Sequence, residues 1–382
     1  MSLKNSELIL ANARIVMADE VVLGNLVAKD GMIVEIDQSN AQVAGAINCE
    51  KRYVCPGLVE LHTDNLERHM EPRPGVNWPL RAAVIAHDAE LAGCGITTVF
   101  DSMRVGSIPG SGRHEEYARG LADVILELKA KEKLKASHFI HLRAEVCSST
   151  LVEELTAFGS EDRVGIVSLM DHTPGQRQFR NMDKFKAYVT GKRNFNDDAF
   201  SRHVDMLSNL RATYGAEHEE TACREAVRLG AVLASHDDTT REHVRQSAER
   251  DAAVAEFPTT IEAARACREN GLAIMMGAPN LIRGGSHSGN ASARELAQED
   301  LLDVMSSDYV PAALLQSAFK LADIWGDFPR AVRCVTANPA NAVGLEDRGE
   351  IAIGHRADLI VFERDNDIGI LDKAYSRGRR IF

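Results

Sequence analysis

The chain has 382 residues, of which 45% are hydrophobic, so it is long enough to bury a large core in one domain or several. Its 44 basic and 56 acidic side chains give a net charge of −12, which argues against a general nucleic-acid-binding protein with a basic face. Such an acidic balance is common among soluble proteins, and any anionic ligand would need a local cluster of positive charge or a metal ion.

The seven cysteines are scattered along the chain, and no Cys-x-x-Cys pair occurs. Their spacing favours neither a disulfide framework nor a cysteine-rich zinc site, and we interpret them as small buried side chains in a reducing compartment. The N-terminus lacks the apolar core of a signal peptide, and no apolar stretch approaches the length that spans a membrane. We therefore expect a cytoplasmic protein that contacts neither membrane nor nucleic acid.

The first part of the chain is predicted to form short strands separated by turns. Apolar runs with β-forming residues occupy residues 7–10, 13–16, 25–28 and 32–36. The tripeptide Lys29-Asp30-Gly31 between the last two runs is typical of a hairpin turn. No helical period is visible here, so we expect a small β-unit over residues 1–54.

From about Val54 onward, apolar strands alternate with amphipathic helices, a pattern typical of parallel βα units. Two helices are predicted over residues 115–135 and 259–270, the second ended by Gly271. The predicted strands are residues 58–62, 96–101, 138–145, 164–172, 231–236, 252–257, 272–277 and 303–308. Eight such units indicate an α/β fold with a distorted (β/α)8 TIM barrel over residues 55–343; an open doubly wound sheet is the alternative.

The end of the chain returns to β-structure after a helix beyond Ala331. Strands are predicted over residues 349–354 and 357–362. Because the β-rich segments 1–54 and 344–382 flank the barrel, we expect them to form one small β-sandwich domain. The irregular region 174–197, rich in Arg, Lys and Asn, is predicted to form a loop with a helix over the barrel mouth.

Ionisable side chains stand at the carboxyl ends of the predicted strands, which form the active-site face of a TIM barrel. A single histidine at a strand end is usually an ordinary hydrogen-bonding residue, but five strand ends with ligand-type residues favour a metal site. Histidines and carboxylates without thiolates suit zinc first, with iron, manganese or cobalt as alternatives, as one or two ions. The predicted metal ligands are His62, Asp64, Glu145, His172, His236 and Asp308.

Two segments resemble the amidohydrolase superfamily over nearly the whole chain. Residues 56–64, Pro-Gly-Leu-Val-Glu-Leu-His-Thr-Asp, are similar to its opening motif, and residues 336–340 with 349–359 look like its closing segment. The resemblance implies a metal-dependent barrel in which Asp308 is the general base. Asp64 departs from the pattern, because most members have a second histidine there; a carboxylate keeps a ligand but adds negative charge.

A narrower resemblance includes this departure. Residues 62–79, residues 171–178 (Asp-His-Thr-Pro-Gly-Gln-Arg-Gln) and residues 277–290 are similar to the diphosphohydrolases of the carbon–phosphorus lyase pathway. These enzymes convert ribose 1-methylphosphonate 5-triphosphate into the 5-phosphate and pyrophosphate. The resemblance implies phosphoanhydride hydrolysis rather than amide cleavage.

A triphosphate requires several cationic contacts, and arginine matches phosphate oxygens bidentately. A glycine-rich run follows the seventh predicted strand, where backbone N–H groups can form an anion-binding nest, although a flexible turn is the commoner explanation of such a run. The predicted phosphate-binding residues are Arg73, Arg143, Arg177, Arg283, Gly284 and Gly285. His287, in the same run, is a candidate leaving-group acid, a phosphate contact or a plain loop residue.

Two other functions remain open at this stage. One is an amidohydrolase that cleaves a C–N bond in a cyclic amide or N-acyl substrate, although the arginines would then lack a purpose. The other is a non-catalytic barrel used as a scaffold, although every expected ligand type is present. The partner we expect is a small phosphorylated molecule, bound by a homo-oligomer.

Overall fold

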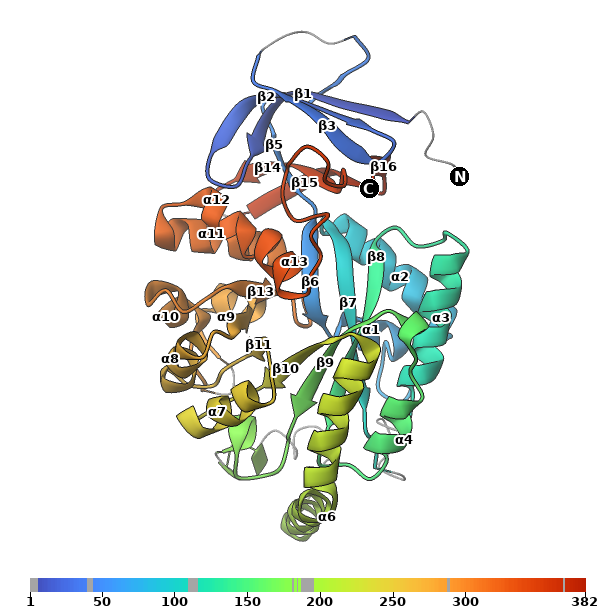
Figure 1. Cartoon of the computed structure of the whole chain (residues 1–382), viewed down its shortest axis with the longest axis vertical. Helices are drawn as coiled ribbons and strands as arrows, with labels where there is room; N and C mark the ends of the chain where they lie inside the picture. The colour runs from blue at the N-terminus through green and yellow to red at the C-terminus, as the bar shows by residue number, and fades with distance from the viewer. Residues whose placement is uncertain are drawn as a thin grey trace.

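The computed structural model describes residues 6–39, 44–108, 116–180, 182–183, 185–186, 196–286, 289–366 and 368–382. It contains a barrel and a separate sheet built from both ends of the chain (Figure 1). Among the described residues, no helix has the length and apolar character needed to cross a membrane.

The two ends of the chain share one mixed eight-stranded sheet in the order β16-β15-β14-β5-β1-β2-β3, with β4 beside β1. It encloses a core of its own, to which β1, β2, β5 and β14 contribute apolar side chains. The prediction that the terminal segments combine is thus confirmed. The strands are β1 Glu7–Val16, β2 Val21–Lys29, β3 Met32–Asp37, β4 Ile47–Asn48, β5 Tyr53–Pro56, β14 Leu359–Asp365, β15 Ile368–Ser376 and β16 Arg379–Arg380.

Two details of this sheet follow from single residues. The runs predicted as separate strands at 7–10 and 13–16 form one strand, β1, with an irregularity between Leu10 and Ala13 where Asn12 has a φ of 54°. The predicted hairpin is confirmed: Asp30 and Gly31, with φ of 52° and 86°, form the two-residue turn between β2 and β3.

The strand predicted over residues 349–354 is wrong. This segment consists of turns, and both of its end glycines, Gly349 and Gly354, have left-handed φ values of 90° and 89°. A Cβ on Gly349 would lie 2.8 Å from the Cα of Ala337, so the chain passes directly over α13 at this point. The adjacent predicted strand, 357–362, corresponds to β14.

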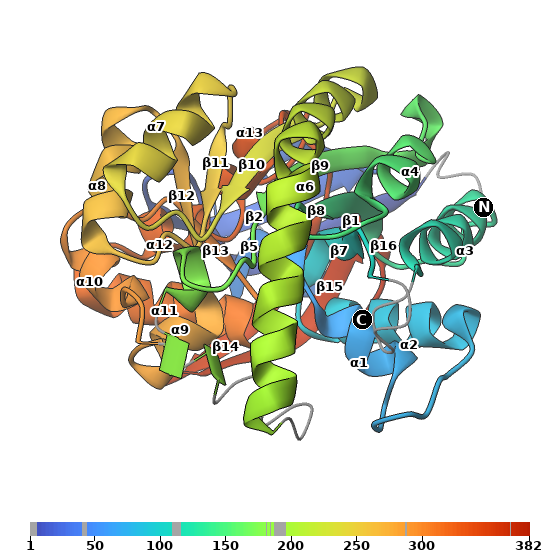
Figure 2. The same cartoon turned by 90° about the horizontal axis from the view of Figure 1, so that it is seen from below.

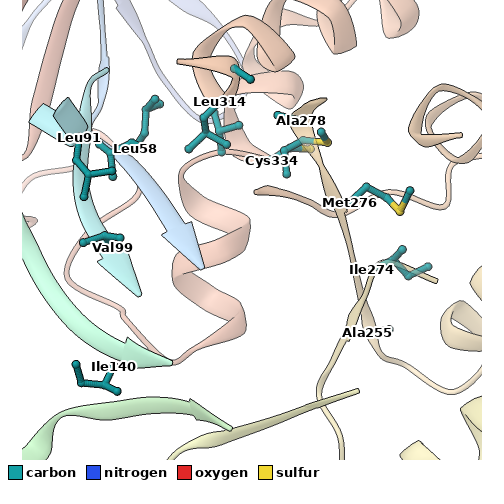
Figure 3. Close-up of a cluster of buried hydrophobic side chains, with 14 of the residues drawn as sticks. Leu58, Leu91, Val99, Ile140, Ala255, Ile274, Met276, Ala278, Leu314 and Cys334 are labelled. Atoms are coloured by element: carbon teal, nitrogen blue, oxygen red, sulfur yellow. The ribbon is translucent and has the colours of Figure 1, made fainter. Parts of the chain in front are cut away.

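All eight predicted barrel strands are confirmed. They pair in parallel in the order β13-β12-β11-β10-β9-β8-β7-β6. Figure 3 shows apolar side chains that pack around them, among them Leu58, Ile140 and Ile274. The strands are β6 Leu58–Thr63, β7 Ile96–Val105, β8 Ser137–Glu145, β9 Val164–Met170, β10 Val232–His236, β11 Val254–Glu256, β12 Ala273–Gly277 and β13 Val304–Ser306.

The first and last barrel strands, β6 and β13, are joined differently at their two ends. Near the carboxyl ends, Thr63 pairs with Asp308, and the N–H of Asp64 donates to the Asp308 carbonyl at 3.0 Å. Near the other end, the N–H of Val59 donates to the Val335 carbonyl, and the N–H of Met305 donates to the Cys334 carbonyl, both at 2.9 Å. Residues 334–335 therefore lie between β6 and β13, and the predicted distorted barrel is confirmed.

Helices surround the barrel, and the 33-residue helix α6 runs across the front of it in Figure 2. The two predicted helices correspond to α3 and α8. Part of the predicted mouth loop, residues 181, 184 and 187–195, lies outside the described residues. The helices are α1 Asn65–Met70, α2 Leu80–Gly93, α3 Ala118–Ala130, α4 Leu151–Thr156, α6 Asp197–Leu229, α7 Arg241–Glu249, α8 Ile261–Glu269, α9 Ala278–Arg283, α10 Ala293–Gln298, α11 Ala313–Trp325, α12 Phe328–Arg333 and α13 Ala337–Ala342, with 3-10 turns at Ser160–Asp162 and Arg177–Phe179.

A buried network of hydrogen-bonded polar side chains connects α2 with β7 and β8. His138 lies between two carboxylates, with Nδ1 2.7 Å from Asp101 and Nε2 3.1 Å from Asp88. Asp101 also contacts His87 at 3.0 Å. Although burial alone lowers the pKa of His138, the charges of Asp101 and Asp88 raise it to about 10. His138 is therefore an imidazolium at neutral pH, held by two acceptors.

This buried imidazolium predicts a specific loss of stability at alkaline pH. The folded-state pKa of about 10 lies above the ordinary value of 6.5, so the stabilisation is complete below pH 6.5 and is lost as the pH rises through 10. Thermal unfolding of the wild type should show a Tm that falls over this range. In His138→Gln the Tm should start lower and change less with pH. Parallel Tm curves for the two proteins would contradict the assignment.

Candidate metal centre at the mouth of the barrel

A cavity of about 730 Å³ opens at the carboxyl ends of the barrel strands. Its walls come from distant parts of the sequence, because the ends of parallel strands meet at one face of a closed barrel. All six predicted metal ligands lie on this wall: His62, Asp64, Glu145, His172, His236 and Asp308.

Three residues that follow barrel strands on this wall have left-handed backbones. The φ values of Asp237, Phe257 and Asp308 are 57°, 56° and 54°, and they follow β10, β11 and β13. This conformation is uncommon for side chains other than glycine, and for a residue as bulky as phenylalanine it is costly. These turns direct the three side chains toward the cavity. If the strands continued instead, successive side chains would point alternately to opposite faces.

The end of the first barrel strand supplies a histidine and a carboxylate on one side of the cavity. The Nε2 atom of His62 lies 3.8 Å from the carboxylate of Asp64, and the guanidinium of Arg143 forms an ion pair with the same carboxylate. Because residues two apart on a strand point the same way, the spacing of the motif places both groups together. The opening motif therefore acts as one local unit, with Arg143 on β8 holding it.

A second group lies beside the first, at the ends of β8, β9 and β10, and the ring centroids of His236 and His62 are 5.7 Å apart. Glu145 contacts the Nδ1 atom of His172 and also accepts from the backbone N–H of that residue at 3.3 Å. His236 places its Nδ1 atom 2.8 Å from the carboxylate of Asp237. Potential ligand atoms of His172, His236 and Asp237 all lie within 4.8 Å of one another.

Asp308 lies at the junction of the first and last strands, where its backbone bonds both His62 and Asp64. Burial raises the pKa of its carboxyl, and the charge of Asp64 raises it further, to about 6. This value is close to what a general base needs near neutral pH.

The donor set fits a divalent cation. Among the residues that line the cavity, the carboxylates of Asp64, Glu145, Asp237 and Asp308 accompany the imidazoles of His62, His172 and His236. The thiol of Cys147, also on this wall, donates to Glu145 at 3.1 Å. Mixed nitrogen and oxygen donors suit zinc and its neighbours among the transition metals. The arrangement leaves an excess of buried negative charge at one place, and a bound cation would offset it.

The sequence prediction missed two buried residues beneath this cavity. His141 on β8 and Glu256 on β11 form, with His62, a second group of potential ligand atoms within 4.8 Å. Both precede the last residue of their predicted strands, 138–145 and 252–257, whereas the predicted ligands end a strand or, in the case of Asp64, follow one. A charged residue inside an otherwise apolar strand is the signal that could have identified them.

The fold places only some of the residues predicted to bind phosphate on the cavity wall. Arg143, Arg283 and Gly285 line the cavity. Arg73 is exposed in a short turn with Val76 and is outside the lining. Gly284, with a φ of 84°, ends α9 and is also outside the lining.

Arg177 has a different setting from the one expected. Its guanidinium bonds the buried carboxylate of Asp238 and donates to the His236 carbonyl at 2.9 Å. These two bonds stabilise the chain where β10 ends, and Arg177 itself is not part of the cavity wall. His287, the remaining predicted catalytic residue, lies outside the described residues.

Comparisons with known proteins agree with this geometry. The model of the amidohydrolase family matches residues 80–373. The chain belongs to the amidohydrolase family. Within this family, it is 41% identical over 379 residues to alpha-D-ribose 1-methylphosphonate 5-triphosphate diphosphatase of Escherichia coli, an alignment that covers 98% of the chain and 100% of the relative.

Solved structures share the amidohydrolase fold at much lower identity. A 5-methylcytosine deaminase from Klebsiella pneumoniae has a TM-score of 0.64 at 16% identity, with 98% of each chain covered. An N-acetylglucosamine-6-phosphate deacetylase from Pasteurella multocida has a TM-score of 0.61 at 13% identity, covering 98% of this chain and 99% of the other. These likenesses concern the fold alone.

Proposed function

We propose that this amidohydrolase is a metal-dependent diphosphatase that cleaves alpha-D-ribose 1-methylphosphonate 5-triphosphate to the 5-phosphate and pyrophosphate. The observation that carries the proposal is the 41% identity to the diphosphatase of Escherichia coli along the whole length of both chains. The cavity supports it, because arginines and potential cation ligands converge there while the protein as a whole has a net charge of −12.

We propose that the cation, with zinc as the first candidate and one or two ions bound, is held by His62, Asp64, Glu145, His172, His236 and Asp308. A divalent cation in such a site supplies positive charge that activates water and stabilises the oxygens of a phosphoryl group. Asp308, whose pKa is raised by burial to about 6, would take the proton from the attacking water. Its backbone bonds to His62 and Asp64 hold this base beside the proposed ligands.

The triphosphate would be received by the arginines that the fold leaves on the cavity wall. Arg283 is the last residue of α9, and Gly285, two residues later, has a φ of 157°. The guanidinium of Arg283 is a suitable contact for phosphate oxygens. The N–H groups of Gly284 and Gly285 already donate to the carbonyls of Leu281 and Asn280, so the proposed contact is the arginine itself. Arg143 is already paired with Asp64, so we assign it mainly to holding the opening motif.

The role of Arg283 predicts a specific kinetic effect. In Arg283→Ala, KM for a triphosphate should rise by about 10- to 100-fold, since a charge-assisted hydrogen bond contributes about 1.5–3 kcal/mol. KM for a monophosphate analogue should change much less. Arg265→Ala, at an exposed arginine on α8 paired with Glu299, is the matched control. Equal effects of Arg283→Ala on both ligands would contradict a triphosphate contact.

The main alternative is hydrolysis of a C–N bond, since 26% identity over 232 residues also relates the chain to an adenine deaminase of Geobacillus kaustophilus. The deciding experiment is to assay the cation-loaded enzyme on ribosyl triphosphates, on adenine and on N-acyl substrates. Release of pyrophosphate from the triphosphate, with no ammonia or carboxylate from the others, is the expected outcome. The reverse pattern would overturn the proposed function.

Three features of the organisation are part of the proposal. We place the catalytic domain at residues 55–343, with the second domain formed by 1–54 and 344–382, and we propose a homo-oligomer. We also propose a cytoplasmic location. The cytoplasmic location is supported by the seven cysteines, all of which are free thiols.

A further inference from the structure

The imidazole of His62 connects the cavity to a carboxylate buried behind it. Its Nδ1 atom lies 3.2 Å from the Oε1 atom of Glu256, and its Nε2 atom lies on the side of Asp64, at 3.8 Å. The Glu256 side chain is fully buried, and Glu256 is not part of the cavity lining. The ring thus has one nitrogen toward the cavity and the other toward the barrel interior.

The donor and acceptor roles in this contact follow from the chemistry of the two groups. A carboxylate only accepts hydrogen bonds, so the Nδ1 atom of His62 must carry a hydrogen. In a neutral imidazole the Nε2 atom then keeps its lone pair. Glu256 therefore selects the form of His62 that can bind a cation from the cavity.

The neighbouring histidine does not compete for this carboxylate. The Nδ1 atom of His141 lies 2.8 Å from the Leu61 carbonyl, an acceptor, and its Nε2 atom lies 2.9 Å from the Ser168 hydroxyl. The distance from His141 to Glu256 is 3.6 Å, beyond a normal hydrogen bond. The closest ring contact of Glu256 is consequently that with His62.

The backbone after Glu256 is shaped to support the same ring. Phe257 has a φ of 56°, and its ring centroid lies 5.0 Å from that of His62, edge to face. Successive side chains of a strand normally point to opposite faces, and the left-handed turn at Phe257 brings both residues to His62. A bulky residue in this conformation stores strain, which is characteristic of functional positions.

We propose that Glu256 is a positioning residue that fixes the tautomer and the orientation of His62, so that Nε2 faces the cation site. The proposal rests on the proposed function in one respect, namely that His62 is a cation ligand. Carboxylates that bond the outer nitrogen of a ligating histidine raise its basicity and hold its ring. Glu256 reaches His62 from β11, across the barrel from β6.

The test is a titration of cation-free protein with Zn²⁺, which does not depend on any substrate. In Glu256→Gln, which keeps the size of the side chain but loses the charge, the Kd for Zn²⁺ should rise by about 10- to 100-fold. Excess Zn²⁺ should restore most of the kcat. Unchanged Zn²⁺ affinity in this variant would overturn the inference, whereas a wild type that binds no Zn²⁺ would overturn the proposed cation site itself.

The matched control is Asp101→Asn. Asp101 is also a fully buried carboxylate that contacts imidazoles, those of His87 and His138, but neither of these rings lines the cavity. Asp101 is the register partner of Thr63 in the sheet, but among the imidazoles of the described residues its carboxylate contacts only those of His87 and His138. This variant should therefore lower the Tm and leave the Kd for Zn²⁺ within about twofold, because the bonds it loses do not involve a proposed ligand. An equal loss of Zn²⁺ affinity in both variants would assign Glu256 a structural role only.

A second measurement uses the wild type and does not depend on the variants folding. Nitrogen-15 spectra of histidine-labelled, Zn²⁺-loaded protein should show His62 with hydrogen on Nδ1 and the cation on Nε2, with His62→Asn identifying the signal. Hydrogen on Nε2 would overturn the proposal.

Discussion

Asp308→Asn is expected to lower kcat by on the order of 10³-fold while the protein stays folded and keeps its cation. Asparagine matches the shape of aspartate and preserves the backbone bonds from residue 308 to His62 and Asp64, which close the barrel. It cannot accept the proton of an attacking water. The measurement is steady-state pyrophosphate release with the cation-loaded variant.

The interpretation of this result depends on two companion measurements. Metal analysis and thermal unfolding of Asp308→Asn should both resemble the wild type, because five proposed ligands remain: His62, Asp64, Glu145, His172 and His236. A kcat near that of the wild type would remove Asp308 from the role of base. A loss of cation together with kcat would instead assign Asp308 chiefly to holding the ion.

His236→Ala is expected to remove most of the bound cation. The side chain of His236 lies within 4.8 Å of the ligand atoms of both His172 and Asp237, so its loss opens the group in which it is one of three members. The decrease in affinity should exceed the 10- to 100-fold typical of residues that only support a ligand. Metal analysis after dialysis of the purified variant measures it directly.

The control for this variant is another histidine of the same half of the barrel. His243 lies on α7 and contacts the backbone N–H of Thr239, outside the cavity wall. His243→Ala should retain the cation content of the wild type. Full occupancy in His236→Ala would exclude this histidine from the ligand set and place the ion nearer to His62.

The barrel was predictable because each of its strands is an apolar run with a polar end. Sequence pattern failed at residues 349–354, where Ile351 and Ile353 stand at alternate positions and would share one face of a strand. In the structure Ile351 is buried and Ile353 is 68% exposed. Two glycines with positive φ bend this segment, which bonds β3 only at its end, where the N–H of Gly354 donates to the Ile33 carbonyl at 2.8 Å. Apolar residues at alternate positions favour a strand, but they do not report whether the backbone has a neighbour to pair with.

The candidate site was predictable where a ligand follows its strand, and less so where its role depends on a partner elsewhere in the chain. His62 and Asp64 are neighbours in sequence, so their shared direction could be inferred. Arg177 has the chemistry of a phosphate ligand, but its partner Asp238 follows β10, and only the folded chain brings the two together. Glu256 likewise acquires its role through a histidine that is 194 residues away.

The terminal sheet has a consequence for how the protein is made. Strand β5 pairs with β1 and with β14, and β6 pairs with β7 and, at Thr63, with Asp308. Each of these two strands therefore lacks one of its neighbours until β14 or the residues after β13 have been translated. Such non-local pairings fold slowly and leave apolar strands exposed in the nascent chain. We therefore expect newly synthesised molecules to depend on chaperones until the last strands emerge.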